Sequence, residues 1–521
     1  MKKNLLSKNL HQWLFLLVCF IATLPSWAED YTEDGIIYDI NTSTNTATVK
    51  GLEDKSATSA EIRNSVAGCE VTSLGWGAFS GCCALTSINI PSTVNSIEGY
   101  AFGGCSALTS LNIPSSVTSI GSGAFYGCSA LTSINIPSSV TSIGSGAFYV
   151  CSSLTSINIP SSVTSIGDMA FYGCSSLTSI NIPSLVTSIE DYVFADCSSL
   201  TSINIPSSVT SIESAAFLGC SALKSINIPS SVTSIGERAF NDCTALTAIN
   251  LPSSVTSIEW SAFNGCSSLT SINIPSSVTS IGWYAFSGCS ALTSINIPSS
   301  VKSIGEAAFG GCDALKIVLI QSNRIEFGGG VFGSNTNIYA VSDNNLEFHL
   351  LSYYDPNQYP YVNNYIGGTW YTYDTPNIYD RNGSAISSDK WSGNKLDYNS
   401  GQYLKTILET STNAQTFISN NNAIYNELSE DIRKNLEDNL KKIDDLANII
   451  AAGDAALSDL STNLSNAYND VRNAVTGIEH ATITPAATLR VYDLNGRRIN
   501  VNHVDELPQG IYVINGKKVI R

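Results

Sequence analysis

The chain has 521 residues, a formal net charge of -17 at pH 7 and only 13% charged residues. An acidic surface repels phosphate backbones, so this balance argues against nucleic acid as a partner. Hydrophobic residues make up 43% of the chain, enough to bury a large core, which argues against a disordered protein.

The first residues have the pattern of an export signal. Three Lys precede an apolar run from Trp13 to Leu24, and small residues follow up to Ala28. We expect residues 1–28 to be a signal peptide, whose loss of three Lys and no acid would change the net charge from -17 to -20. No other stretch approaches about 20 apolar residues, so the sequence predicts no transmembrane helix.

Residues 29–70 precede the repetitive part of the chain. They contain two β-type runs, Tyr38–Ile40 and Thr46–Lys50. We interpret them as a hairpin that forms an N-terminal β cap over the open edge of the repetitive part.

From Val71 the sequence repeats itself every 23 residues without an insertion. Phe recurs from Phe79 to Phe332, Cys from Cys82 to Cys312 and Pro from Pro91 to Pro298, always at this spacing. One unit, starting at Leu131, reads LTSINIPSSVTSIGSGAFYVCSS. The equivalent positions of successive units are called columns. The apolar columns cannot be buried within one unit, so the repeats must stack into a solenoid.

Each unit predicts one strand and one turn of helix. The polar and apolar alternation of Ser133–Ile136 suits a short strand, which Pro137 ends because it lacks an amide donor. Ala147, Phe148 and Cys151 would share one face of a short helical turn. The expected fold class is therefore an α/β solenoid of the leucine-rich-repeat type.

Asn-Ile-Pro after the strand and Ala-Phe-x-Gly-Cys after the turn resemble the BspA-type leucine-rich repeat family. The resemblance covers residues 71–343. It implies a bacterial surface protein that adheres to host proteins or other cells.

Two columns invite a functional interpretation. The Cys column could form disulfides or a metal chain, but it lacks clustered pairs and companion His residues, so we interpret it as small, buried and apolar. The outward Asn column, from Asn89 to Asn296, could bind a glycan by many weak contacts, or could only form hydrogen-bond ladders.

Variation gathers in the turn beside Ala-Phe, where aromatic residues would point outward. Exposed Tyr and Trp are favoured in binding hot spots, so this edge is the candidate contact with a partner, although the rings could instead fill grooves between turns. The candidates are Trp76, Tyr100, Tyr126, Tyr149, Tyr172, Tyr192, Trp260, Trp283 and Tyr284.

Nothing in the sequence predicts catalysis or a cofactor. After signal removal the chain has only three His residues, His349, His480 and His503, all outside the regular repeats. They suggest no pairing with a Ser or Cys nucleophile, so we predict that the protein is not an enzyme.

The C-terminal part changes in character twice. Residues 344–402 are rich in Tyr and Asn and predict a cap or linker, and 403–476 predict an amphipathic helical region. Apolar residues recur at three or four from Leu428 to Ile450 and from Leu457 to Ala474. These two helices would form a spacer hairpin or, through residues 428–475, a coiled coil for self-association.

Residues 482–521 predict a β segment. Two Asn-Gly pairs, at Asn495 and Asn515, lie between β-type runs, which is a hairpin signal. Val491–Arg497, Leu507–Tyr512 and the basic end Lys517-Lys518 resemble the sorting domain of the type IX secretion system. That resemblance implies passage through the outer membrane.

Two functions are compatible with these patterns. The first is an exported surface protein whose solenoid binds an extracellular protein or glycan. The second is a structural or spacer protein of the cell surface without a ligand. Near-identity among the repeats favours the second or a binding mode of many weak contacts, and the outward aromatic residues favour the first.

Overall fold

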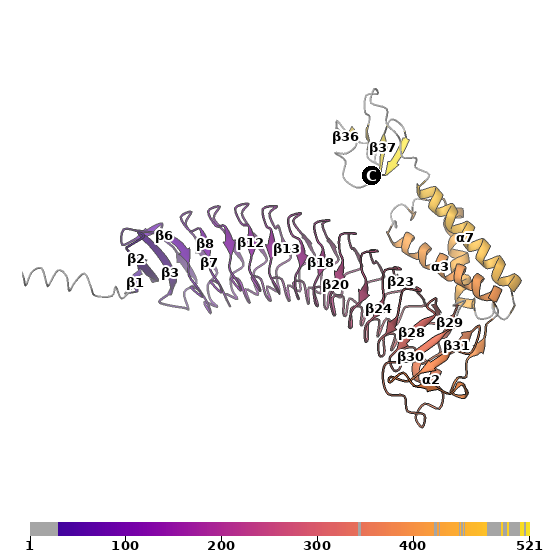
Figure 1. Cartoon of the computed structure of the whole chain (residues 1–521). Coiled ribbons are helices and arrows are strands. Elements are labelled where there is room, and N and C mark those ends of the chain that lie inside the picture. Colours follow the sequence, from indigo (N-terminus) through magenta and orange to yellow (C-terminus); the bar gives the residue numbers. More distant parts are fainter. Residues whose placement is uncertain are drawn as a thin grey trace, which may run out of the picture. The chain divides into compact units, whose positions relative to one another are not determined.

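The computed structural model describes residues 30–341, 345–396, 398–420 and, with short gaps, 425–476, together with four short strands between 491 and 520. The chain divides into two compact units, Met1–Leu223 and Lys224–Arg521, and each is described by itself (Figure 1). The predicted stack of 23-residue leucine-rich-repeat-type units followed by helices is confirmed.

Unit 1 begins with the β cap. Its strands β1, β2 and β3 form an antiparallel meander, and β3 then pairs in parallel with β6, the first strand of the stack. The edge of the stack is thereby hydrogen-bonded instead of open. The cap strands are β1 (Tyr31–Glu33), β2 (Ile36–Asn41), β3 (Thr46–Leu52), β4 (Ser59–Glu61) and β5 (Ser65–Val66), and β6 spans Cys69–Leu74.

Each repeat of unit 1 contributes two short strands to two parallel strand series, each of which is divided into shorter hydrogen-bonded sheets. The pairing advances by one repeat at a time, as in Ser119 with Ser142. The Asn sheet, which carries the Ser-x-Asn motif, has β7 (Ser87–Asn89), β9 (Ser110–Asn112), β11 (Ser133–Asn135), β13 (Ser156–Ile157), β15 (Ser179–Asn181) and β17 (Ser202–Asn204). The second sheet has β8 (Ser96–Ile97), β10 (Ser119–Ile120), β12 (Ser142–Ile143), β14 (Ser165–Ile166), β16 (Ser188–Ile189) and β18 (Ser211–Ile212).

Unit 2 continues both strand series, and parallel pairing extends past residue 343 to β34. Its Asn sheet has β19 (Ser225–Asn227), β21 (Ala248–Asn250), β23 (Ser271–Asn273), β25 (Ser294–Ile297), β27 (Ile317–Ile320), β29 (Asn337–Ala340), β31 (Thr369–Thr372) and β34 (Asn394–Lys395). Its second sheet has β20 (Ser234–Ile235), β22 (Ser257–Ile258), β24 (Ser280–Ile281), β26 (Ser303–Ile304), β28 (Arg324–Phe327), β30 (Glu347–Leu350), β32 (Asn377–Tyr379) and β33 (Ala385–Ile386).

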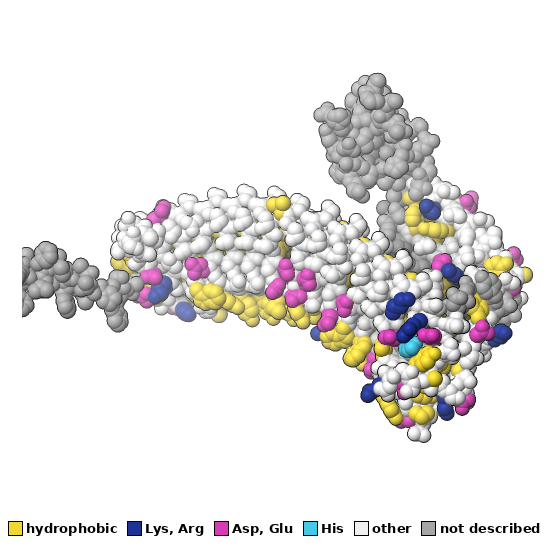
Figure 2. All heavy atoms as spheres, in the orientation of Figure 1, with side chains coloured by type: hydrophobic (Ala, Val, Ile, Leu, Met, Phe, Trp, Pro, Cys, Tyr) yellow, Lys and Arg dark blue, Asp and Glu magenta, His cyan; other side chains and the backbone are white. Residues whose placement is uncertain are grey.

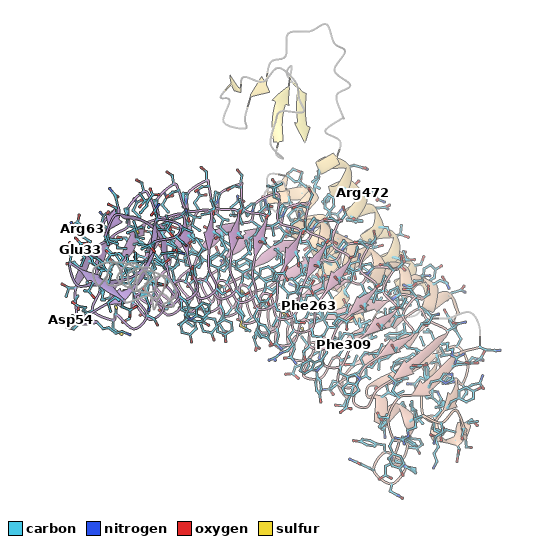
Figure 3. All side chains as sticks on the ribbon, turned by 60° about the vertical axis from the view of Figure 1, so that its left-hand side comes forward. Glu33, Asp54, Arg63, Phe263, Phe309 and Arg472 are labelled. Atoms are coloured by element: carbon cyan, nitrogen blue, oxygen red, sulfur yellow. The ribbon has the colours of Figure 1, made fainter. Side chains whose placement is uncertain are left out.

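The core consists of the predicted apolar columns. In unit 1 the Phe rings from Phe79 to Phe217 stack with centroids 5.2 to 5.7 Å apart, and these rings are fully buried. In unit 2 the same column runs from Phe240 to Phe332, and Phe263 and Phe309 are labelled in Figure 3. Each ring completes the apolar surface of its neighbour, as stacking requires.

The segment around Ala-Phe is a turn and not the predicted turn of helix. The two positions that flank Ala-Phe adopt left-handed backbone in successive repeats, as at Gly123 (φ 63°) and Gly127 (φ 68°), so helical hydrogen bonding cannot continue. The turn instead bonds to the next repeat, as in Phe125 N–H to Ala147 O at 2.8 Å. The second strand of each repeat, Ser-Ile, was also absent from the sequence prediction.

Within the described residues, three long helices follow the stack in unit 2. The first is not one of the two amphipathic helices that the periodicity predicts. α3 (Tyr398–Asn420) lies against β21, β23 and β25 on one side and α7 (Asp454–Thr476) on another, and α5 (Glu430–Lys441) also packs on α7. The short elements are α2 (Val362–Ile366), η1 (Ser388–Lys390) and η2 (Lys442–Asp445).

The apolar stripes that suggested self-association are buried within unit 2. Leu436, Leu457 and Leu464 share a core with Leu404 of α3 and Leu319 of the Asn sheet. The structure therefore gives these stripes an intramolecular use.

Near the C-terminus, β35 (Val491–Tyr492) pairs antiparallel with β36 (Arg498–Ile499), and β37 (Ile511–Ile514) with β38 (Lys517–Ile520). These pairs flank the two Asn-Gly positions, as the hairpin signal predicts. The turns themselves, and the predicted signal peptide, lie outside the described residues.

Val150 provides a test of the left-handed turn. It has φ 55° in a column otherwise dominated by glycine, and a β-branched residue is strained there. We expect Val150→Gly to stabilise the protein by about 1 kcal/mol in urea unfolding. The matched change Gly127→Val should destabilise it by a similar amount. A destabilising Val150→Gly would contradict this account of the turn.

Candidate functional site

Five of the predicted aromatic residues form one continuous run along unit 1. The ring centroids of Trp76 and Tyr100 are 5.2 Å apart, those of Tyr100 and Tyr126 5.9 Å, and those of Tyr126 and Tyr149 4.9 Å. Tyr149 and Tyr172 follow at 4.7 Å. We call this run the aromatic edge. The repeat period brings together rings that are at least 23 residues apart in sequence.

The aromatic edge is partly open to solvent. Trp76 is 68% exposed, Tyr126 43% and Tyr100 39%, whereas Tyr149 and Tyr172 are half-buried. Figure 2 shows hydrophobic side chains as a strip along the lower border of unit 1. Tyr192, one repeat beyond the run, is also half-buried. The prediction that these positions point outward therefore fits the first rings better than the last.

Glycines in the next repeat make room for two of the rings. A Cβ on Gly99 would lie 2.2 Å from the ring of Trp76, and a Cβ on Gly123 would lie 2.7 Å from the ring of Tyr100. Each ring therefore covers a glycine with one face. The ring face that covers the glycine fills a groove between turns, as the alternative interpretation expects. The opposite face of the ring remains exposed.

Unit 2 carries the remaining three candidates. Trp260 is 42% exposed, Trp283 58% and Tyr284 37%. Trp283 covers Gly305 as Trp76 covers Gly99. The guanidinium of Arg238 lies 5.6 Å from the ring centroid of Trp260, within the range of a cation–π interaction.

Acidic side chains lie beside the last rings of the aromatic edge, a feature that the sequence pattern did not predict. A hydrogen bond from Tyr172 to Asp196 raises the pKa of Tyr172 to about 12. Burial, together with the charges of Asp168, Glu213 and Asp191, raises the pKa of Glu190. The carboxylates of three successive repeats therefore repel one another. A count of charges along the repeats would have found them.

The Cys column is buried and unpaired by disulfides, as predicted, but it is not merely apolar. From Cys105 onward, thiols of the column donate a hydrogen bond to the carbonyl of the Phe in the preceding repeat, as Cys128 does to Phe102 at 3.2 Å. The same carbonyl accepts the amide of Cys105. Within the described residues, no group of three or more His, Cys, Asp or Glu side chains is arranged to hold a metal ion.

On the Asn sheet of unit 1, hydroxyl groups form ladders that connect neighbouring repeats. Thr155 donates to the carbonyl of Thr132 at 3.4 Å, and Ser162 to that of Val140 at 2.6 Å. The Asn side chains from Asn89 to Asn204 are exposed. The hydrogen-bond interpretation thus applies to Ser and Thr, since these hydroxyls bond to the backbone.

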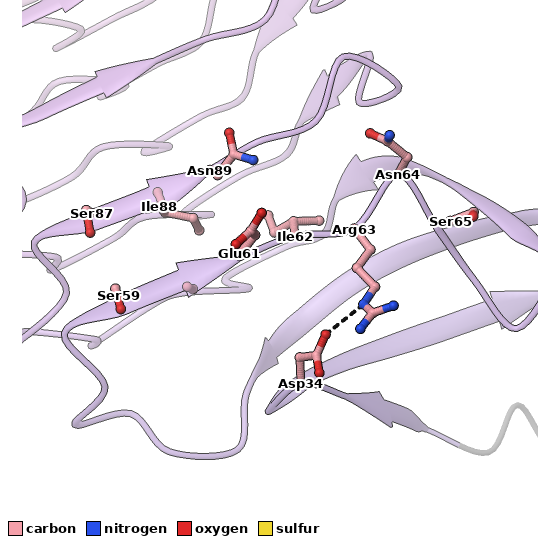
Figure 4. A pocket seen from close by; sticks show the side chains of 11 residues that line it. Asp34, Ser59, Glu61, Ile62, Arg63, Asn64, Ser65, Ser87, Ile88 and Asn89 are labelled. Carbon is pink, nitrogen blue, oxygen red and sulfur yellow. Dashed lines mark hydrogen bonds and ion pairs between the residues drawn. The ribbon is translucent and has the colours of Figure 1, made fainter.

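A polar groove of about 1070 Å³ lies between the cap and the first strand of the Asn sheet (Figure 4). Arg63 borders it and is paired with Asp34 at 2.6 Å and with Glu33 at 3.3 Å. Its other lining groups include Ser59, Glu61 and Asn89. The cation of the groove is therefore already neutralised by the cap.

The described residues offer little for catalysis. His349 lies 3.3 Å from Glu347 and stacks on Tyr379, without a Ser or Cys nucleophile in either contact. His480 and His503 lie outside the described residues. In the part of the chain that the structure describes, no helix combines the length and apolarity needed to cross a bilayer.

The family model that matches is the BspA type leucine rich repeat region, over residues 72–199, 141–267, 187–316 and 233–348. These matches together span more than half of the chain. The chain belongs to the BspA-type leucine-rich repeat family. Leucine-rich repeat solenoids of this kind are typically non-enzymatic scaffolds, and no enzyme family is indicated.

Solved structures include similar proteins from bacteria. A leucine-rich repeat protein from Bacteroides ovatus is 30% identical, with 66% of this chain and 100% of that chain covered and a TM-score of 0.48. A leucine rich cell surface protein from Faecalibacterium prausnitzii is 29% identical over 66% and 98%, with a TM-score of 0.40. The pneumococcal vaccine antigen PcpA is 20% identical over 61% and 94%, with a TM-score of 0.40. The search of curated proteins gives no match.

The Cys column predicts how stability depends on pH. Burial raises the pKa of Cys312 from 9.0 to about 12 and raises that of Cys82 as well. Between the two values the folded state keeps a proton that the unfolded state has lost, so the free energy of unfolding falls as pH rises above 9. Each such thiol can remove up to about 1.4 kcal/mol per pH unit.

Urea unfolding at pH 8 and pH 10 measures this effect. We expect a lower midpoint at pH 10, and a smaller decrease in Cys312→Ser, which keeps a donor but does not titrate in this range. An unchanged midpoint in the parent protein would show that the thiols do not control alkaline stability.

Proposed function

We propose that this protein is an exported cell-surface adhesin that binds an extracellular protein through the aromatic edge of its solenoid. The observation that supports it best is the run of five contacting rings in which Trp76, Tyr100 and Tyr126 keep exposed surface. Isolated exposed aromatics are ordinary, whereas a contiguous apolar strip is typical of an interaction site.

The rigidity and the chemistry of the rings in the aromatic edge suit the binding of a partner. The rings are held by one another and by the rigid stack, so little side-chain entropy is lost when a partner binds. Tyr and Trp combine apolar area with a polar group, which makes them frequent hot-spot residues. The turn that carries them is also the variable part of an otherwise uniform repeat.

Export and surface display are part of the proposal. They rest on the signal-like residues 1–28 and on the resemblance of residues 482–521 to a type IX sorting domain. The description of the Faecalibacterium relative as a cell surface protein agrees with this location. The proposed boundaries are a cap at 29–70, the 23-residue repeats at 71–343, a Tyr- and Asn-rich cap at 344–402 whose strands continue the parallel pairing, and the helical region at 403–476.

A spacer without a ligand is the second candidate. It is favoured by the near-identity of the repeats and by the rings that cover glycines, since both features serve the stack itself. A spacer needs no exposed aromatic surface, however, and this difference separates the two functions.

The test compares two variants of the full chain. Trp76→Ser with Tyr126→Ser removes exposed ring surface from the aromatic edge. Leu185→Ser is the matched control, because Leu185 is 52% exposed in a column that is otherwise Ser from Ser116 to Ser300. Binding to a panel of immobilised extracellular-matrix proteins and glycans is measured for each.

We expect the aromatic variant to lose at least about tenfold in affinity for the bound protein, and the control to bind like the parent. Equal binding by all three proteins would leave the aromatic edge without a role. Absence of binding to the whole panel, with surface exposure of the chain intact, would favour the spacer.

A further inference from the structure

The repeats of unit 1 carry acidic charge without any cation. From residue 71 to residue 223 the sequence has no Lys, Arg or His, but it has six acidic residues. They are Glu98, Asp168, Glu190, Asp191, Asp196 and Glu213. Opposite charges within these repeats therefore cannot neutralise them, and the negative potential is available to a partner.

Most of this charge lies at the end of the aromatic edge. Asp168, Glu190, Asp191 and Glu213 occupy the two positions before the left-handed turn in three successive repeats. Figure 2 shows acidic side chains grouped beside the hydrophobic strip. Asp168 and Asp191 are exposed, so a partner on the strip can reach their carboxylates.

The corresponding edge of unit 2 shows how such a surface accepts a cation. Arg238 lies in the preceding repeat, one column after the column of Trp260, and its guanidinium lies over the indole ring at 5.6 Å. In unit 1 no Lys, Arg or His side chain of the repeats can contact the rings of Trp76 and Tyr126 in this way, because the sequence has none between residues 64 and 223.

We propose that the aromatic edge of unit 1 binds a basic polypeptide segment, whose Arg or Lys side chains contact the exposed rings and the neighbouring carboxylates of Asp168, Glu190, Asp191 and Glu213. This inference rests on the proposed function and names the chemistry of its partner. Apolar contact with the rings and charge complementarity with the acids act on the same partner.

The ring arrangement disfavours a glycan at this place. Sugars stack on open ring faces, but the planes of Tyr126, Tyr149 and Tyr172 lie within 7° of parallel at 4.7 to 4.9 Å, so these rings cover one another. They present edges and hydroxyl groups instead. The covered faces leave a sugar no stacking surface on these three rings, and a neutral glycan has no cation for the neighbouring carboxylates.

The carboxylates can accept further hydrogen bonds from a partner. One oxygen of Asp191 accepts the amide of Ser214 at 2.8 Å, and a carboxylate offers about four acceptor positions. Replacement by the amide keeps that accepting oxygen and removes the charge. Amide variants therefore separate the electrostatic contribution from the local structure.

The probe is a short fluorescent peptide that alternates Arg with Ser, and its counterpart alternates Glu with Ser. The full chain is compared with the edge variant Asp168→Asn, Glu190→Gln, Asp191→Asn and Glu213→Gln. The control variant Glu53→Gln, Asp54→Asn, Glu61→Gln and Glu70→Gln removes the same charge from cap-region positions in unit 1 that are exposed. Thermal unfolding and circular dichroism establish that each variant is folded.

We expect the parent and the control to bind the Arg peptide and not the Glu peptide, with affinity that falls as salt is raised. The edge variant should bind the Arg peptide about tenfold more weakly. Trp76→Ser with Tyr126→Ser should weaken binding as well. Equal weakening in the edge and control variants would mean that net charge alone attracts the peptide and would overturn the proposal.

A further comparison separates this inference from the proposed function. If the aromatic variant loses binding to an extracellular protein while the edge variant keeps it, the aromatic edge is a binding site but its partner is not basic. If neither variant affects binding to protein or peptide, the proposed function fails together with the inference.

Discussion

The structure depends on one constraint, which is that every repeat is completed by the next. The backbone of each turn bonds forward, as Phe102 N–H does to Ala124 O at 2.7 Å, and each Phe ring stacks on its neighbour. The Cys thiol bonds backward to the Phe carbonyl of the preceding repeat. An insertion would shift all three interactions together, and this explains why the period of 23 is kept without a break.

The same constraint determines where the surface can vary. Columns that contact the neighbouring repeat through buried atoms are nearly uniform, with only conservative changes such as Leu111 and Val193, so they carry no information about a ligand. In the turn before and after Ala-Phe only the backbone conformation is constrained. Its side chains therefore vary between repeats, as Trp76, Tyr126 and Asp168 show. Glycines such as Gly99 then allow a ring to lie across the next repeat. Recognition and stacking therefore occupy different columns.

The sequence predicted what periodicity controls and missed what hydrogen bonding controls. The buried columns and the Ser-x-Asn strand could be inferred from their spacing. The second strand, as at Ser142–Ile143, is too short to show an alternation of polar and apolar residues. The helical turn was a wrong prediction, because a sequence pattern does not reveal that residues such as Val150 have a left-handed backbone. α3 is rich in Ser, Thr and Asn, which are weak helix formers, and it is stabilised by burial in unit 2.

The candidate site shows the same division. Nine aromatic positions could be named because they lie in columns that point outward. Which rings contact one another could not be predicted, because some of the contacting rings lie in different columns of successive repeats. Trp76, Tyr100 and Tyr126 occupy three different columns, yet their rings meet, because each leans toward the next repeat. The acids beside Tyr172 have no period and were overlooked for that reason. In a repeat protein the regular positions specify the fold, and the departures from regularity are where a partner can be distinguished.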